Sequence, residues 1–166
     1  MTHRLVRGAL SGAAATLTMS AVMLAGQQAG LMPAQPPKHI VRGLLPGSKR
    51  RPKPGEGVLA ALAHLGFGVA SGMAFALLSR RPDRRVASGV GYALLIWAVS
   101  YEGWAPRLSV LPPIRHDLPT RPAVMAAGHI VYGATLGAVL NLLEPVEQPP
   151  VPEETRQKEP RPALSF

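Results

Sequence analysis

The stretches AHLGFGVASGMAFALL (residues 63–78) and GHIVYGATLGAVLNLL (residues 128–143) share the pattern that decides the fold. Each is mostly apolar, with a histidine near its start and a pair of glycines four residues apart. They begin 65 positions apart (128 − 63), and five of their sixteen positions are identical. In a helix, small residues at this spacing lie on one face and let a neighbouring backbone approach. The repeated pattern therefore predicts two similar helices in tight contact with their neighbours.

Four apolar segments have about the length that a membrane-spanning helix needs. A bilayer core about 30 Å thick takes about 20 mostly apolar residues in a helix. The segments are residues 8–26, 58–78, 86–104 and 123–143. The sequence therefore predicts an all-α fold, a four-helix transmembrane bundle over residues 1–143.

The first segment also has the features of a signal peptide. It is rich in Ala, Gly, Ser and Thr, and Arg4 and Arg7 precede it. Positive charge followed by an apolar stretch is typical of secretory signals. Its apolar part is long for that role, so we expect a retained helix, with cleavage as the open alternative.

The repeat predicts how the four helices are organised. Each half is one helical hairpin, and RRPDRR (residues 80–85) is a short charged turn between the halves' neighbouring spans. Because two helices return the chain to its starting side, we expect parallel repeats about an axis near the membrane normal. Small-residue faces should hold the helices together. The glycines predicted to pack are Gly8, Gly12, Gly68, Gly72, Gly133 and Gly137.

The C-terminal tail, the net charge and the lack of cysteine indicate which classes of partner and cofactor to expect. Residues 144–166 hold six Pro and five Glu, which predicts a disordered tail. The net charge of +9 comes from basic residues at the borders of apolar runs, which favours lipid headgroups over nucleic acid. The chain has no cysteine, so disulfides, zinc–thiolate sites and iron–sulfur clusters are excluded. We expect no cofactor.

His64, His129 and Glu102 are the candidate site residues. Each histidine lies about six residues into its predicted span, and the third span ends on the same side with Glu102. One hypothesis is a proton-responsive or ligand-binding cluster, because ionisable groups within spans usually face the bundle interior. The other is that each neutral histidine only hydrogen-bonds to a neighbouring helix. No metal-ligand spacing and no catalytic motif is present, so no metal or catalytic residue is predicted.

Four linked motifs resemble a family of small bacterial inner-membrane proteins known only as a domain of unknown function, with a more distant likeness to YagU-type proteins. The motifs are GALSGAAAT (8–16), AHLGFGVASG (63–72), WAVSYEGWAP (97–106) and GHIVYGATLG (128–137). The resemblance covers roughly residues 5–143 and implies a multi-span membrane protein. His64, Gly68, His129 and Gly133 match its motif positions. The family is more often apolar at the position of Glu102, which weakens a catalytic role for that residue.

These features favour a non-enzymatic membrane protein, an accessory or interaction protein whose partners are the lipid bilayer and another protein or a second copy of itself. One alternative is a small oligomeric proton-coupled transporter or channel that uses His64 and His129. Another is a lipid enzyme with the histidines and Glu102 as acid and base. The dense positive charge of residues 80–85 predicts that both termini are cytoplasmic in an inner-membrane protein.

Overall fold

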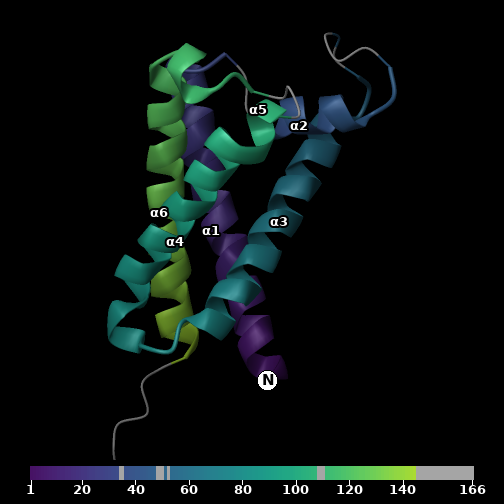
Figure 1. The fold of residues 1–166 in the computed structure, drawn as a ribbon. Coiled ribbons are helices and arrows are strands. Elements are labelled where there is room, and N and C mark those ends of the chain that lie inside the picture. The colour runs from purple at the N-terminus through teal and green to yellow at the C-terminus, as the bar shows by residue number, and fades with distance from the viewer. Residues whose placement is uncertain (34–35, 48–50, 52, 108–110, 145–166) are drawn as a thin grey trace, which may run out of the picture.

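The fold is known from a computed structural model that describes residues 1–33, 36–47, 51, 53–107 and 111–144. Within these residues all regular structure is helical (Figure 1). Three helices are long and apolar enough to cross a membrane: α1 (Thr2–Gln28), α3 (Glu56–Leu78) and α6 (Thr120–Leu143). The prediction of an all-α fold is confirmed. The predicted disordered tail lies, beyond Glu144, outside the described residues.

Large apolar side chains cover the outer faces of the long helices. Leu62 of α3 is 61% exposed and Leu142 of α6 is 78% exposed. A helix that is apolar around its whole circumference belongs either in a protein core or in a membrane. Because these side chains have no protein around them, hydrocarbon is the medium that suits them.

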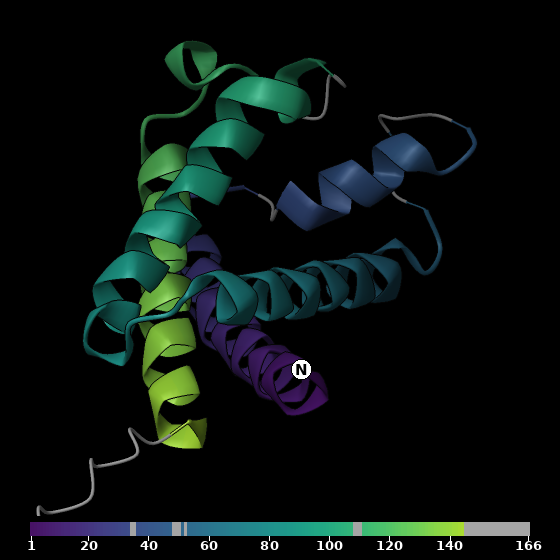
Figure 2. The same cartoon turned by 60° about the horizontal axis from the view of Figure 1, so that its bottom comes forward.

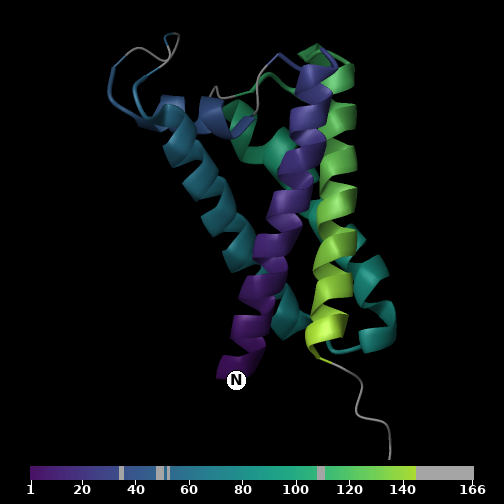
Figure 3. The same ribbon diagram turned by 180° about the vertical axis from the view of Figure 1, so that it is seen from behind.

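The helices pack as antiparallel neighbours. α1 packs against α3 and α6, and α4 (Arg85–Val99) packs against α6 (Figures 1 and 3). The start of α1 and the end of α6 lie at the same end of the molecule, together with the 310 turn η1 (Pro82–Arg84). Removing α1 as a signal peptide would take Met19 and Met23 out of the core.

Backbone contacts between glycines hold α1 against α3. A Cβ on Gly8 would lie 2.7 Å from the carbonyl oxygen of Gly72, and a Cβ on Gly12 would collide with the carbonyl oxygen of Gly68. Such close approach is how small residues stabilise helix pairs in lipid. The same kind of contact joins α4 to α6, where Gly89 and Gly133 meet backbone to backbone. The four glycines predicted to pack in α1 and α3 therefore lie at the α1–α3 contact. Gly133 of α6 packs in the same way against α4.

The third predicted span, residues 86–104, differs from the other three. α4 has 15 residues, and the chain continues as a π-helical turn, η2 (Ser100–Trp104), and then α5 (Ala105–Arg107). Both junctions keep a right-handed helical backbone, so the 23 residues from 85 to 107 (107 − 85 + 1) form one interrupted helix. At 1.5 Å per residue it is roughly 34 Å long. Three candidate spans are therefore established, and a fourth crossing stays a prediction.

A short helix lies in the region between the first two predicted spans. α2 (Pro36–Leu44) begins at a proline, which the first turn of a helix accepts because its missing N–H has no intrahelical partner there. Its Arg42 forms an ion pair with Glu56 at the start of α3, with 2.9 Å between Nε and Oε2. This pair fixes α2 beside the N-terminal end of α3 (Figure 2).

Polar clusters close both ends of the helix assembly. At the end that holds the start of α1, the buried Arg85 contacts Glu144 at 2.6 Å, and Arg4 donates a hydrogen bond to the carbonyl oxygen of Ser79 at 2.6 Å. At the other end, Asp117 accepts a hydrogen bond from Tyr101 and pairs with Arg121. Charges at helix ends suit the headgroup layers on either side of a hydrocarbon core.

Candidate functional site

A pocket opens where α1 and α3 separate. α1 contacts α3 through Gly8 and Gly12, but farther along the helix Met19 and Met23 pack instead against Gly128 of α6. α3 therefore diverges from the other long helices toward its N-terminal end (Figures 1 and 2). The space left behind is a cavity of about 290 Å3, which we call the front pocket.

Six helical segments, α1, α2, α3, α4, η2 and α6, line the front pocket, and its walls are mainly apolar. α1 and α6 supply methionines, α2 supplies aliphatic side chains, and η2 supplies an indole. The lining residues are Thr16, Met19, Met23, Pro37, Ile40, Val41, Ala63, His64, Phe67, Gly68, Ser71, Ile96, Ser100, Trp104, Met125, His129 and Tyr132. Methionine adapts its shape to different apolar partners. An apolar cavity of this size with a few polar groups has the character of a small-ligand site, at the lower end of the usual volume range of about 300–1,000 Å3.

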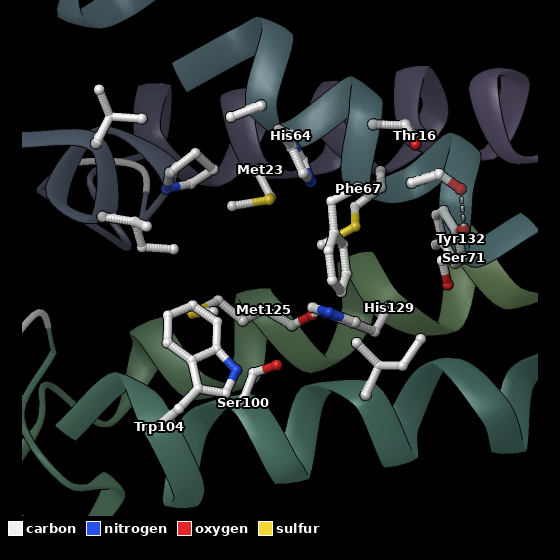
Figure 4. A pocket seen from close by; sticks show the side chains of 17 residues that line it. Thr16, Met23, His64, Phe67, Ser71, Ser100, Trp104, Met125, His129 and Tyr132 are labelled. Carbon is white, nitrogen blue, oxygen red and sulfur yellow. Dashed lines mark hydrogen bonds between the residues drawn. The ribbon is translucent and has the colours of Figure 1, made fainter. Parts of the chain in front are cut away.

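Both predicted histidines lie on the walls of the front pocket. His64 comes from α3 and His129 from α6, and Figure 4 shows their rings among the lining side chains. The Nδ1 atom of His129 lies 2.8 Å from the carbonyl oxygen of Met125. In the neutral tautomer that satisfies this contact, Nδ1 carries the proton and Nε2 is left as an acceptor. Among the described residues, His64 has no side-chain hydrogen bond, so both rings keep polar capacity for a bound molecule.

The third predicted site residue, Glu102, lies elsewhere. Its side chain is exposed, and it does not line the pocket. The wide turn of η2 instead places its first and last residues, Ser100 and Trp104, on the pocket wall, while Tyr101 is buried in a separate cluster. The structure therefore brings together two of the three predicted residues. π-helical turns are frequent at functional sites because they re-aim side chains in this way.

Two tyrosine hydroxyls join neighbouring helices at residues that line the front pocket. The hydroxyl of Tyr132 donates a hydrogen bond of 2.9 Å to the carbonyl oxygen of Gly68, which joins α6 to α3. The hydroxyl of Tyr92 on α4 lies 3.1 Å from the carbonyl oxygen of Ser71 on α3. Sequence reasoning did not select these tyrosines as site residues. A signal was present for one of them, since Tyr132 and Phe67 hold matching positions after the two histidines, and both line the pocket.

The pocket holds no arrangement typical of metal chemistry. Across the part of the chain that the structure describes, no three His, Cys, Asp or Glu side chains converge as metal ligands would. Two imidazoles in mainly apolar surroundings can hydrogen-bond to a ligand or exchange a proton. They do not by themselves make a metal centre or a hydrolytic site.

Comparison with known proteins identifies the family and leaves the activity open. No curated protein and no solved structure shows a significant match to this chain. A family of unknown function, DUF6789, matches residues 2–151, which include every helix described above. The match covers most of the 166 residues, so this chain belongs to the DUF6789 family of unknown function.

Proposed function

We propose that the protein is a non-enzymatic, multi-pass membrane protein that binds an apolar group in its front pocket. The observation that carries this proposal is the mainly apolar cavity of about 290 Å3 between helices that are themselves apolar outside. A binding role of this kind suits an accessory protein of a larger assembly or a homo-oligomer. The absence of catalytic motifs in the sequence favours binding over turnover.

The proposal includes an internal duplication, with α1–α3 and α4–α6 as parallel repeats. Corresponding contacts support it: Gly12 meets Gly68 in one pair as Gly89 meets Gly133 in the other. The halves are not packed symmetrically. α1 lies along α6, whereas α3 and α4 separate beyond the hydrogen bond between Tyr92 and Ser71 (Figure 2). The front pocket occupies the gap where this second contact would be.

The proposed location is a bacterial inner membrane, with the start of α1 and the end of α6 on the cytoplasmic side. The end of the molecule that holds both also holds the charged turn of residues 80–85, and positive charge next to spans is retained in the cytoplasm. A cysteine introduced at Asp83 tests the orientation. It should resist an impermeant thiol reagent added to intact cells and react after lysis. Labelling of intact cells would reverse the orientation.

Photolabelling tests the pocket. A purified sample in detergent is irradiated with an alkyl diazirine, an apolar photoreactive probe, and the labelled peptides are mapped. We expect labels on the methionine-bearing walls, and a several-fold loss of them in Ala63→Phe, whose new ring would fill the cavity. Ala74→Phe is the matched control, because Ala74 is exposed on the same helix and does not line the pocket. Equal labelling in both variants would contradict the proposal.

Proton-coupled transport is a second candidate, because His64 and His129 line the same pocket. An unperturbed histidine changes charge near pH ~6.5, within reach of a proton gradient. Replacing both by Asn in reconstituted vesicles, with an internal pH-sensitive dye, should abolish a proton flux if transport is the function. If the histidines serve packing alone, the double variant should fold as the parent does, and neither protein should move protons.

A further inference from the structure

The front pocket adjoins a second cleft, which the same helix pair lines. This rear cleft, of about 330 Å3, lies between α1 and α3 beneath α2. Three residues line both spaces: Thr16, Pro37 and His64. The two cavities therefore adjoin each other beside α1 and α3 at the level of His64, and we call them together the α1–α3 gap.

Both cavities of the α1–α3 gap are bordered by exposed apolar side chains. Phe67 borders the front pocket and is 57% exposed, and Leu62 borders the rear cleft and is 61% exposed. His64 lies eight residues (64 − 56) into α3, roughly 12 Å along the helix at 1.5 Å per residue. A chain molecule in the hydrocarbon layer can thus reach the gap from the side without crossing water.

Positive charge lies at the α2 side of the gap. Lys38 lines the rear cleft, next to Pro37. The neighbouring basic groups are occupied, because Arg42 pairs with Glu56 and Lys53 donates to the carbonyl oxygens of Arg42 and Leu45. Across the described residues, the Lys38 ammonium has no such partner. The Lys38 ammonium is therefore available to a ligand in the rear cleft.

We infer that the α1–α3 gap binds an anionic phospholipid, with an acyl chain beside His64 and the phosphate beside Lys38. This inference rests on the proposed apolar binding and names its occupant. The apolar walls match the chain, and the Lys38 ammonium on the wall of the rear cleft matches the headgroup. A zwitterionic lipid offers the same chain without net negative charge, so charge should decide between the two.

Fluorescence quenching by brominated lipid tests the inference. The chain has two tryptophans, and Trp97→Phe leaves only Trp104, which lines the front pocket. This variant is reconstituted in vesicles that contain a small fraction of phosphatidylglycerol or phosphatidylcholine brominated on one acyl chain. Since a basic residue near an anionic surface contributes about 1 kcal/mol, binding of the phosphatidylglycerol should be about fivefold stronger.

Two substitutions separate the parts of the inference. Lys38→Gln should remove the preference for phosphatidylglycerol, whereas Arg51→Gln, which removes an exposed charge from the same loop region, should keep it. Ala63→Phe should lower the quenching by both lipids, whereas Ala74→Phe should not. Equal quenching by both headgroups, or quenching that Ala63→Phe leaves unchanged, would overturn the lipid assignment. Diazirine labelling that still responds to Ala63→Phe would then leave apolar binding standing with another occupant.

Discussion

The two ends of the α1–α3 pair differ in the size of the residues that face each other. At the closed end, Gly8 and Gly12 meet Gly72 with backbone against backbone. At the open end the same helices carry Met23 and His64, and between them lies a cavity instead of a contact. In lipid, where close packing drives association, residue size alone decides where two helices stay together. The glycines hold the two helices together at the closed end. Toward the N-terminal end of α3, among the described residues, no such pair of glycines faces each other, and a cavity is left for a ligand.

The largest effect is expected from filling the closed end. A Cβ on Gly72 would lie 2.6 Å from the Cα of Gly12, so Gly72→Leu forces backbone against backbone apart. We expect a loss of more than about 3 kcal/mol of stability, at the upper limit of overpacking costs. Thermal unfolding in detergent, followed by size-exclusion chromatography, measures it. Gly66→Leu is the control, because nothing lies within 4 Å of a Cβ there. Equal melting temperatures would contradict the contact.

Loss of the buried ion pair below the closed end comes next. Glu144→Gln leaves the Arg85 guanidinium, whose side chain is 4% exposed, without its counter-charge. Breaking a buried pair costs about 3 kcal/mol. Asp83→Asn removes the ion pair between Asp83 and Arg84 on the surface. The side chains of Arg84 and Asp83 are 70% and 73% exposed, so this loss should cost less than about 0.5 kcal/mol. The same unfolding assay compares them, and similar losses would mean that Glu144 is not the essential partner.

The second hairpin should respond as the first does, with a smaller effect for a smaller side chain. A Cβ on Gly89 would collide with the carbonyl oxygen of Gly133, so Gly89→Ala should cost about 2 kcal/mol. Nothing lies within 4 Å of a Cβ on Gly91. Gly91→Ala should therefore stabilise the protein by about 0.5 kcal/mol, since Ala is the better helix former. If both variants melt above the parent, the α4–α6 contact is not a glycine contact.

The smallest effect is expected where α6 contacts Gly68, next to the front pocket. Tyr132→Phe removes the hydrogen bond from α6 to the carbonyl oxygen of Gly68 and keeps the ring. Interhelical hydrogen bonds in membranes average about 0.6 kcal/mol, so the melting temperature should fall only slightly. Tyr132→Leu also removes ring packing and should cost about 2 kcal/mol more. Identical losses in the two variants would assign the whole contribution to the ring.

Much of the fold could be predicted because its causes are local. Hydropathy located the three long helices and the segment that contains α4, and four-residue spacing selected the glycines that meet at the closed end. The matching positions of His64 and His129 in two similar apolar stretches predict a similar depth, and both residues line the front pocket. Gly89 escaped notice because its helix carries no comparable Gly-x-x-x-Gly pair.

The rest depends on features that spacing does not encode. Glu102 was expected beside the histidines, but the π-helical turn of η2 places Ser100 and Trp104 on the pocket wall instead. α2 was not among the predicted helices, although Pro36 and Pro37 are compatible with the first turn of a helix. The pocket itself results from the divergence of α3, which depends on contacts between segments far apart in the sequence.

Sedimentation after alkaline washing tests whether hydrocarbon surrounds these helices. Cells that produce the full chain are lysed without detergent, and their membranes are washed with sodium carbonate and pelleted at high speed. Helices with leucines exposed on their outer faces should keep the protein in the pellet until detergent is added. Recovery of folded protein in the carbonate supernatant would contradict the membrane assignment, and with it the lipid that we place between α1 and α3.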